Sequence, residues 1–396
     1  MQAGISTVNI TPPEGSPMAC FPVVRGQQPR CARGIHDTLL ATALVLCDGQ
    51  RTIGICSCDL TLIHHMDVEK IRSEVGEEVS DLGDEKLIIA ASHTHSGPEN
   101  TYLFGTEPGD EAVETLNSKI ASAVVAAARK LEPVELSAAT GRLELSHNRR
   151  VTDENGRSRM VREHEAGTTE GPVDPDLQVL CCDATDGRMG ILYNWAAHAL
   201  TLGPKNRLFS ADYPGAARRA IQRSYSDSAV LFLNGAAGNI HPRQCMRNDT
   251  ELTEQVGGRV GKKVLELADK ARKVRADKLR FASDTLRFTN RMDPALQVEV
   301  ELSCLRLGPV IFAFVPGEVF VQFQLEFKNR VEADHVFFAG YTNGWPGYVP
   351  TQESYETGGY GVDARQDDPP EFCRTALPPG AGEKILDALV EISNRV

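Results

Sequence analysis

The chain contains 396 residues, of which 41% are hydrophobic and 24% charged, the composition of a globular protein with a sizeable core. Its formal net charge of −12 at pH 7 argues against nucleic acid or an anionic membrane surface as the main partner. No apolar run approaches the roughly 18 to 20 residues that cross a bilayer, so no membrane span is expected.

The N-terminus and the cysteines together predict a cytoplasmic location. The opening MQAGISTVNITPPEG has neither the basic nor the apolar segment of a secretory signal. Several of the ten cysteines stand inside apolar runs such as IGICSCDL and VLCCDA, which is typical of reduced, buried thiols.

Apolar runs that indicate strands alternate along the chain with amphipathic stretches that indicate helices. Strands are predicted at Leu39–Cys47, Thr52–Leu60, Leu87–Ala91, Val134–Ser146, Leu177–Cys182, Met189–Asn194, Val230–Leu233, Phe281–Phe288, Leu296–Leu305, Val310–Val315 and His335–Gly340, after a short first strand within Gly4–Gly15. Helices are predicted at Asp67–Val79, Glu111–Leu131, Tyr213–Tyr225, Glu251–Ala271, Val319–Val331 and Lys384–Val396. This order, without internal repeats or a long linker, predicts one α/β domain over residues 1–396, with mixed β-sheets flanked by helices.

Residues 148–171 interrupt this pattern because they are polar, charged and poor in hydrophobic side chains. Long segments of this kind in compact domains are surface loops or active-site lids. We therefore predict a mobile loop or a lid here.

Two histidines follow the buried strand Leu87–Ala91 directly, in the sequence SHTHSGP. In an extended segment residues i and i+2 point to the same side, so His93 and His95 can face one pocket at the end of the strand. Neutral imidazole is a preferred ligand of zinc. The alternative is a pair of loop histidines bonded to carbonyls and water.

Three further segments place a metal-binding residue type where a strand-like run breaks into a polar turn. They contain His198 in NWAAHA, His241 in NGAAGNIHP and Glu318 in FVPGE. Zinc hydrolases use three protein ligands of this kind and leave one position open. Taken singly, His198 fits a core histidine and Glu318 fits a carboxylate at a helix N-terminus equally well.

The motifs together resemble those of a known family. The order ITPPEG, ASHTHSGPEN, NWAAHA, DYPG, NGAAGNIHP, FVPGE and GYTNGWPGYVPTQESYETGGYG resembles the catalytic domain of the neutral, non-lysosomal ceramidases. Members of that family are zinc amidases that cleave the N-acyl bond of ceramide. The resemblance implies the same catalytic-domain fold and one Zn²⁺ ion per chain.

Carried over to matching positions, the family's zinc ligands fall on His93, His198, Glu318 and Tyr348. Its substrate-facing groups fall on His95, on Arg149 in SHNRR and on Tyr360. The resemblance thus adds Tyr348, Arg149 and Tyr360 to the histidines and the carboxylate that the strand ends indicate.

The sequence departs from the family pattern at the catalytic serine. Ceramidases carry it in a GDVSP-type turn, where this chain has Gly238-Asn239-Ile240-His241-Pro242, so His241 takes the place of the serine. We expect His241 to act as a further metal ligand, a general acid, an oxyanion donor or simply a turn residue. The family's C-terminal Ig-like domain and secretory signal are not expected here either, and ceramide itself is not the expected substrate.

These residues predict a zinc-dependent hydrolase that cleaves an amide or related acyl bond of a small soluble substrate by metal-activated water. In this hypothesis His95 or His241 stabilises the oxyanion. Arg149 or Tyr360 orients the substrate. One alternative is a metal-dependent lyase or isomerase acting on a polar, sugar-like molecule. The other is a catalytically silent binding module with the same fold. No pattern in the sequence specifies an oligomeric state.

Overall fold

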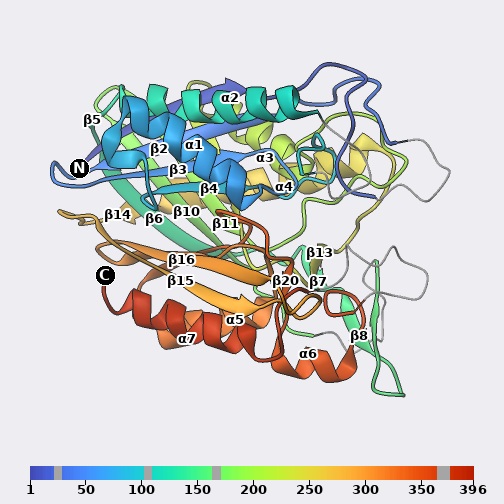
Figure 1. Ribbon diagram of the computed structural model, residues 1–396. Helices are drawn as coiled ribbons and strands as arrows, with labels where there is room; N and C mark the ends of the chain where they lie inside the picture. The colour runs from blue at the N-terminus through green and yellow to red at the C-terminus, as the bar shows by residue number, and fades with distance from the viewer. Residues whose placement is uncertain (22–28, 102–108, 163–170, 364–374) are drawn as a thin grey trace.

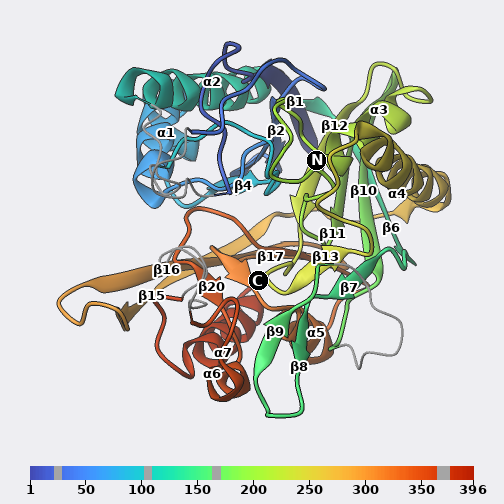
Figure 2. The ribbon, with the colours of Figure 1, turned by 90° about the vertical axis from the view of Figure 1, so that its right-hand side faces the viewer.

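The computed structural model describes the whole chain except residues 22–28, 102–108, 163–170 and 364–374. Three β-sheets face one another around a shared apolar core, and each sheet carries helices on its outer side (Figures 1 and 2). The predicted α/β architecture of mixed sheets with outer helices is confirmed. None of the helices in the described part of the chain combines the length and the apolar character needed to cross a bilayer.

The first sheet contains the N-terminal strands in the order β4-β3-β2-β1-β5. Its strands are β1 (Gln2–Asn9), β2 (Leu40–Cys47), β3 (Thr52–Cys58), β4 (Leu87–Ala91) and β5 (Glu132–Pro133). Strands β2 and β3 form a hairpin across the Asp48-Gly49 turn, whereas β3 and β4 are parallel. The helices α1 (His65–Glu78) and α2 (Asp110–Ala128) cover the outer face of the sheet, and η1 (Ser80–Leu82) follows α1.

The second sheet has the order β12-β11-β10-β6-β14. It consists of β6 (Glu135–Arg142), β10 (Asp176–Ala184), β11 (Gly187–Trp195), β12 (Ala229–Asn234) and β14 (Arg272–Lys273). Only β11 and β12 are parallel, joined by a crossover through α3 (Tyr213–Gln222). That helix and α4 (Thr250–Lys270) pack on the outer face.

The third sheet has the order β15-β16-β17-β19. It consists of β15 (Arg280–Thr289), β16 (Gln297–Leu307), β17 (Val310–Phe314) and β19 (His335–Ala339), and β17 runs parallel to β19. The helices α5 (Val321–Arg330) and α7 (Ala381–Ser393) cover it, and α6 (Gln352–Thr357) lies beside them (Figure 1).

Successive side chains along each strand point to opposite faces of its sheet, so one face packs against the other sheets and the other face packs against the helices. Leu44, Leu192 and Phe312, one from each sheet, belong to the central cluster, whereas their neighbours on the opposite face pack against the helices. Strands buried on both faces read as continuous apolar runs, which is why the sequence located them well. No disulfide joins the nine cysteines that the structure describes, and most of these are buried.

Three pairs of very short strands were not predicted. They are β7 (Ser146–Asn148) with β13 (Ile240–Pro242), β8 (Arg150–Thr152) with β9 (Ser158–Met160), and β18 (Glu318–Val319) with β20 (Tyr348–Val349). Much of the segment 148–171, predicted to be a loop, is therefore the β8–β9 hairpin, and its residues 163–170 lie outside the described part. The lid role of the segment stays a prediction.

The close packing of α3 on α4 can be tested by two glycine substitutions in α4, one at the contact and one at a neighbouring open position that serves as the control. A Cβ atom at Gly257 would lie 2.3 Å from Ala216 Cβ, but at Gly258 of the same helix it would meet nothing within 4 Å. We expect Gly257→Ala to lower the free energy of unfolding by about 1–3 kcal/mol through overpacking. Gly258→Ala should raise it by about 0.5–1 kcal/mol because alanine favours the helix. Urea denaturation measures both, and equal effects of the two changes would contradict the packing described.

Candidate metal centre

His93 lies just beyond the end of β4 with a backbone φ of 66°, a conformation that a non-glycine residue adopts at a cost. Its side chain is buried, and ring atom Nδ1 donates a hydrogen bond to the carbonyl of Thr61 over 2.7 Å. Because a carbonyl oxygen only accepts, Nδ1 carries the ring proton. In the neutral ring the lone pair of Nε2 then points into the site.

His198 follows β11 in the same manner. Its Nδ1 donates to the carbonyl of Ala237 over 2.7 Å and approaches that of Ile240 at 3.1 Å. Burial, and then the nearby charge of Arg149, lower the pKa of His198 to about 3, so the imidazole is neutral. A histidine that is neutral and fixed by a carbonyl through its other nitrogen is the usual form of a metal-binding histidine.

Glu318 is positioned by the pairing of β18 with β20, in which it lies opposite Tyr348. Its atom Oε2 lies 3.4 Å from His93 Nε2 and 3.3 Å from His198 Nε2. Burial works against ionisation of this carboxyl, but His93 and His198 hold its pKa well below its usual value. Neither Glu318 Oε2 nor His198 Nε2 has a hydrogen-bond partner among the described residues, although both are buried.

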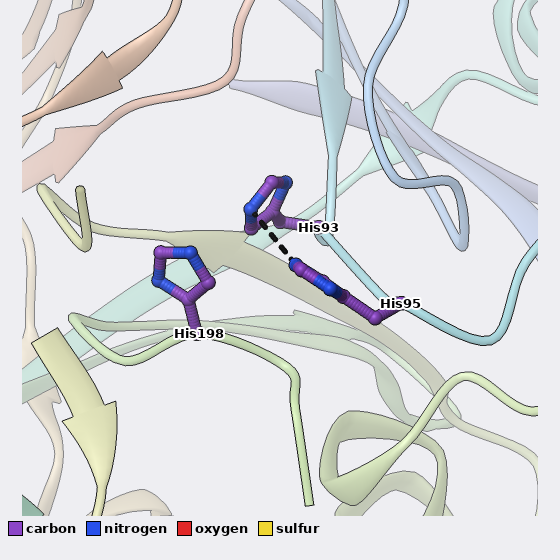
Figure 3. Close-up of side chains that lie close together, drawn as sticks. All are labelled: His93, His95 and His198. Carbon is purple, nitrogen blue, oxygen red and sulfur yellow. Dashed lines mark hydrogen bonds between the residues drawn. The ribbon is translucent and has the colours of Figure 1, made fainter. Parts of the chain in front are cut away.

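His95 completes a group of three imidazoles with His93 and His198 (Figure 3). One nitrogen from each ring lies within 4.8 Å of the others, and His95 Nε2 is 3.3 Å from His93 Nε2. His95 is only partly buried, whereas the other two rings are buried. The Nε2 lone pairs of His93 and His198 converge on the Glu318 carboxylate, and such groups repel one another unless a cation lies between them. The residues present fit a divalent metal ion.

Arg149 brings a buried positive charge to the other side of Glu318. It is 1% exposed, and its Nη2 atom lies 3.2 Å from Tyr348 Oη and 4.0 Å from Glu318 Oε2. The guanidinium also stands 4.4 Å from the centre of the Tyr360 ring, in cation–π contact. Burial disfavours the charge, but Tyr348, Tyr360 and Glu318 raise the pKa of Arg149 overall, so it stays charged.

Arg150, the neighbouring arginine of the SHNRR motif, does not enter the site. Its side chain donates to the carbonyls of Gly358 (2.8 Å) and Tyr360 and to the hydroxyl of Thr357. The two arginines therefore have different contacts. Arg149 contacts the polar groups of the site, whereas Arg150 binds the backbone of the segment that carries Tyr360.

His241 also belongs to the site. The β7–β13 ladder pairs it with His147, and its ring centre lies 5.2 Å from that of His198. The side chain is fully buried, and Nε2 faces Arg149 Nη1 at 2.9 Å. Asn239, two residues earlier, accepts a hydrogen bond from Val321 N through Oδ1 and so caps the first turn of α5.

The structure thus brings together all eight residues expected from the sequence: His93, His95, His198, His241, Glu318, Tyr348, Arg149 and Tyr360. Sequence reasoning missed Tyr341, whose ring stacks on His93 with centres 4.2 Å apart. Its place after β19, in an aromatic and glycine-rich loop, was a usable signal. It also missed Arg30, whose Nη2 donates to the carbonyl of His95 over 2.6 Å, and nothing in its sequence context pointed to that contact.

A sequence profile described as "Neutral/alkaline non-lysosomal ceramidase, N-terminal" matches residues 4–237, more than half of the chain. The chain belongs to this family. The matched stretch contains the imidazole group His93, His95 and His198, and it ends before Glu318. The family resemblance of the motifs is thereby confirmed.

Individual ceramidases are similar to this chain but distant. The neutral ceramidase of Pseudomonas aeruginosa is 23% identical over 261 residues, which make up 60% of this chain and only 38% of that protein. The crystal structure of neutral ceramidase from P. aeruginosa superposes with a TM-score of 0.80, at 18% identity, over 99% of this chain and 74% of that one. A structure named "Ceramidase complexed with C2" gives a TM-score of 0.79 over the same shares. These superpositions establish the ceramidase fold.

The close approach of Gly238 to the Glu318 strand can be tested directly. A Cβ atom at Gly238 would lie 2.3 Å from the carbonyl oxygen of Glu318. We expect Gly238→Ala to displace Glu318 from the imidazoles and to weaken the binding of a divalent metal ion about 10- to 100-fold, as loss of ligand support does in metal sites. Competition with a chromogenic chelator measures the affinity, and Gly258→Ala provides a control far from the site. Unchanged affinity in a folded Gly238→Ala protein would contradict this role.

Proposed function

We propose that this protein is a zinc-dependent hydrolase that cleaves an amide or related acyl bond of a small soluble substrate. One observation carries the proposal: Glu318 Oε2 lies 3.3–3.4 Å from the Nε2 atoms of two buried imidazoles whose Nδ1 atoms are both engaged by backbone carbonyls. A turn or core histidine needs no such arrangement. Membership of the ceramidase family supports a hydrolase, and the name of its P. aeruginosa relative supports the amide class.

The residues that would hold the ion are His93, His198, Glu318 and Tyr348. When bound, Zn²⁺ supplies Lewis acidity, which polarises a carbonyl and lowers the pKa of water. His93 and His198 would offer Nε2 to the ion without any change of tautomer, because a carbonyl engages Nδ1 in each ring. Glu318 contributes negative charge, and its ionisation is already favoured in the folded protein.

The remaining groups surround the space where a substrate carbonyl would lie. His95 has one ring nitrogen 3.3 Å from His93 Nε2 and is the least buried of the three imidazoles, so it can accept or donate a proton at the substrate. Arg149 keeps its charge when buried and can donate to a substrate oxygen. Tyr360 lies on the same side of the site as Arg149. Its hydroxyl is 3.3 Å from Tyr348 Oη, and its ring packs against the Arg149 guanidinium.

Metal content tests this proposal. Purified protein should contain about one zinc ion per chain by mass spectrometry of the metal, and His93→Ala should lose both the ion and hydrolysis of an acyl probe such as p-nitrophenyl acetate. His335→Gln, at a half-buried histidine that begins β19, should keep both. A zinc-free wild-type protein that still hydrolyses the probe would contradict the metal-dependent mechanism.

The replacement of the family's serine by His241 predicts the kinetics of the first turnover. We expect no burst of p-nitrophenol stoichiometric with the enzyme, because His241 cannot form the stable acyl ester that a serine forms. Stopped-flow absorbance at high enzyme concentration measures the burst, and mass spectrometry of the quenched protein detects any acyl adduct. A burst of one equivalent, or an acylated residue in the site, would overturn direct attack by water.

A further inference from the structure

His241 stands where related enzymes carry their serine, and the proposed function leaves its role open. The β7–β13 register puts it between two other imidazoles, with ring centres 5.2 Å from His198 and 5.9 Å from His147. The side chain has no exposed surface, so protein groups alone decide what each ring nitrogen does.

The guanidinium of Arg149 decides the tautomer of His241. Arginine has five N–H donors and no acceptor, and it stays protonated in proteins. The contact of 2.9 Å between Arg149 Nη1 and His241 Nε2 therefore requires a lone pair on Nε2. The ring proton then lies on Nδ1, which faces the sulfur of Cys245 at 3.6 Å, and that thiol in turn donates to the carbonyl of Arg162.

This arrangement leaves His241 no lone pair for other chemistry. A nucleophile, a general base or a metal ligand at this position needs the Nε2 electron pair that Arg149 Nη1 occupies. The Nδ1 proton points away from Arg149, toward Cys245. Two of the roles expected from the sequence are thus incompatible with the hydrogen bonds observed: metal ligand, and donor to the oxyanion through Nε2.

We infer that His241 is a positioning residue that fixes the guanidinium of Arg149 in the orientation that binds the substrate oxygen. The inference rests on the proposed function, in which Arg149 contacts the substrate. Three contacts hold the guanidinium from different directions: His241 Nε2 on Nη1, the carbonyl of Gly238 on Nη2 at 2.5 Å, and the Tyr360 ring against its face. Without His241, Nη1 loses its acceptor and the planar guanidinium can turn about the Cδ–Nε bond.

The geometry also explains why histidine suits this position. A serine side chain is two bonds shorter than an imidazole measured from Cα to Nε2, so its oxygen at position 241 would not reach Nη1 in this backbone. A neutral imidazole supplies a strong acceptor at the required distance without adding charge beside Arg149. Glutamine is the conservative replacement, because its amide oxygen extends about as far as Nε2.

Kinetics of five variants test the inference with p-nitrophenyl acetate as probe. His241→Leu keeps the volume but removes the acceptor, and we expect its KM to rise about 10- to 100-fold with a smaller change in kcat, the usual effect of losing a hydrogen bond to a charged group. His241→Gln should recover most of that loss. In an Arg149→Leu background His241→Leu should add little, because both changes remove the same interaction. His147→Gln, a matched change on the paired strand, should leave KM at the wild-type value.

A second readout does not depend on activity. In protein labelled with ¹⁵N-histidine, the imidazole of His241 should give the pattern of a neutral Nδ1–H tautomer, and its Nε2 resonance should shift in Arg149→Leu. Zinc content should stay at the wild-type level in His241→Leu. An Nε2–H tautomer, loss of zinc in His241→Leu, or equal KM values for His241→Leu and His241→Gln would overturn the positioning role. If no acyl probe is hydrolysed, the proposed function fails, and the tautomer still decides whether His241 accepts from Arg149.

Discussion

Parallel pairing of neighbouring strands is the constraint on which the site depends. In a parallel pair the loops after both strands emerge at the same edge, so a side chain on one loop can reach the backbone of the other. His93, after β4, bonds to the carbonyl of Thr61 after β3, and His198, after β11, bonds to Ala237 after β12. The third parallel pair, β17 and β19, leads to Glu318 and Tyr348. The segments that follow these three strand pairs thus bring imidazole, carboxylate and phenol groups to one place.

The site also buries two opposite charges, those of Glu318 and Arg149, without pairing them directly. Glu318 and Arg149 are both nearly inaccessible, and burial of isolated charges is costly. Their atoms approach only to 4.0 Å, because the carboxylate faces the imidazoles while the guanidinium donates to His241, Gly238 and Tyr348. The carboxylate and the guanidinium therefore keep separate partners within one buried site.

The sequence predicted the long elements better than the short ones, for a physical reason. Strands such as β2 and β17 are buried on both faces, and the long helices have clear apolar stripes, so their patterns are local and repeated. Each strand of the pairs β7–β13 and β18–β20 contains only two or three residues, too few to show a periodic pattern in the sequence. They form because distant loops meet, and they place His241, Glu318 and Tyr348.

The residue types by themselves determined that strand ends carry imidazole and carboxylate groups, and the motif order determined the family. Tertiary structure alone decided which lone pairs are available. The tautomers of His93 and His198 depend on carbonyls 32 and 39 residues away along the chain, and the acceptor role of His241 depends on Arg149, 92 residues away. Such long-range hydrogen bonds leave no local sequence pattern, because they arise only when separate sheets pack and bring their loops to one edge.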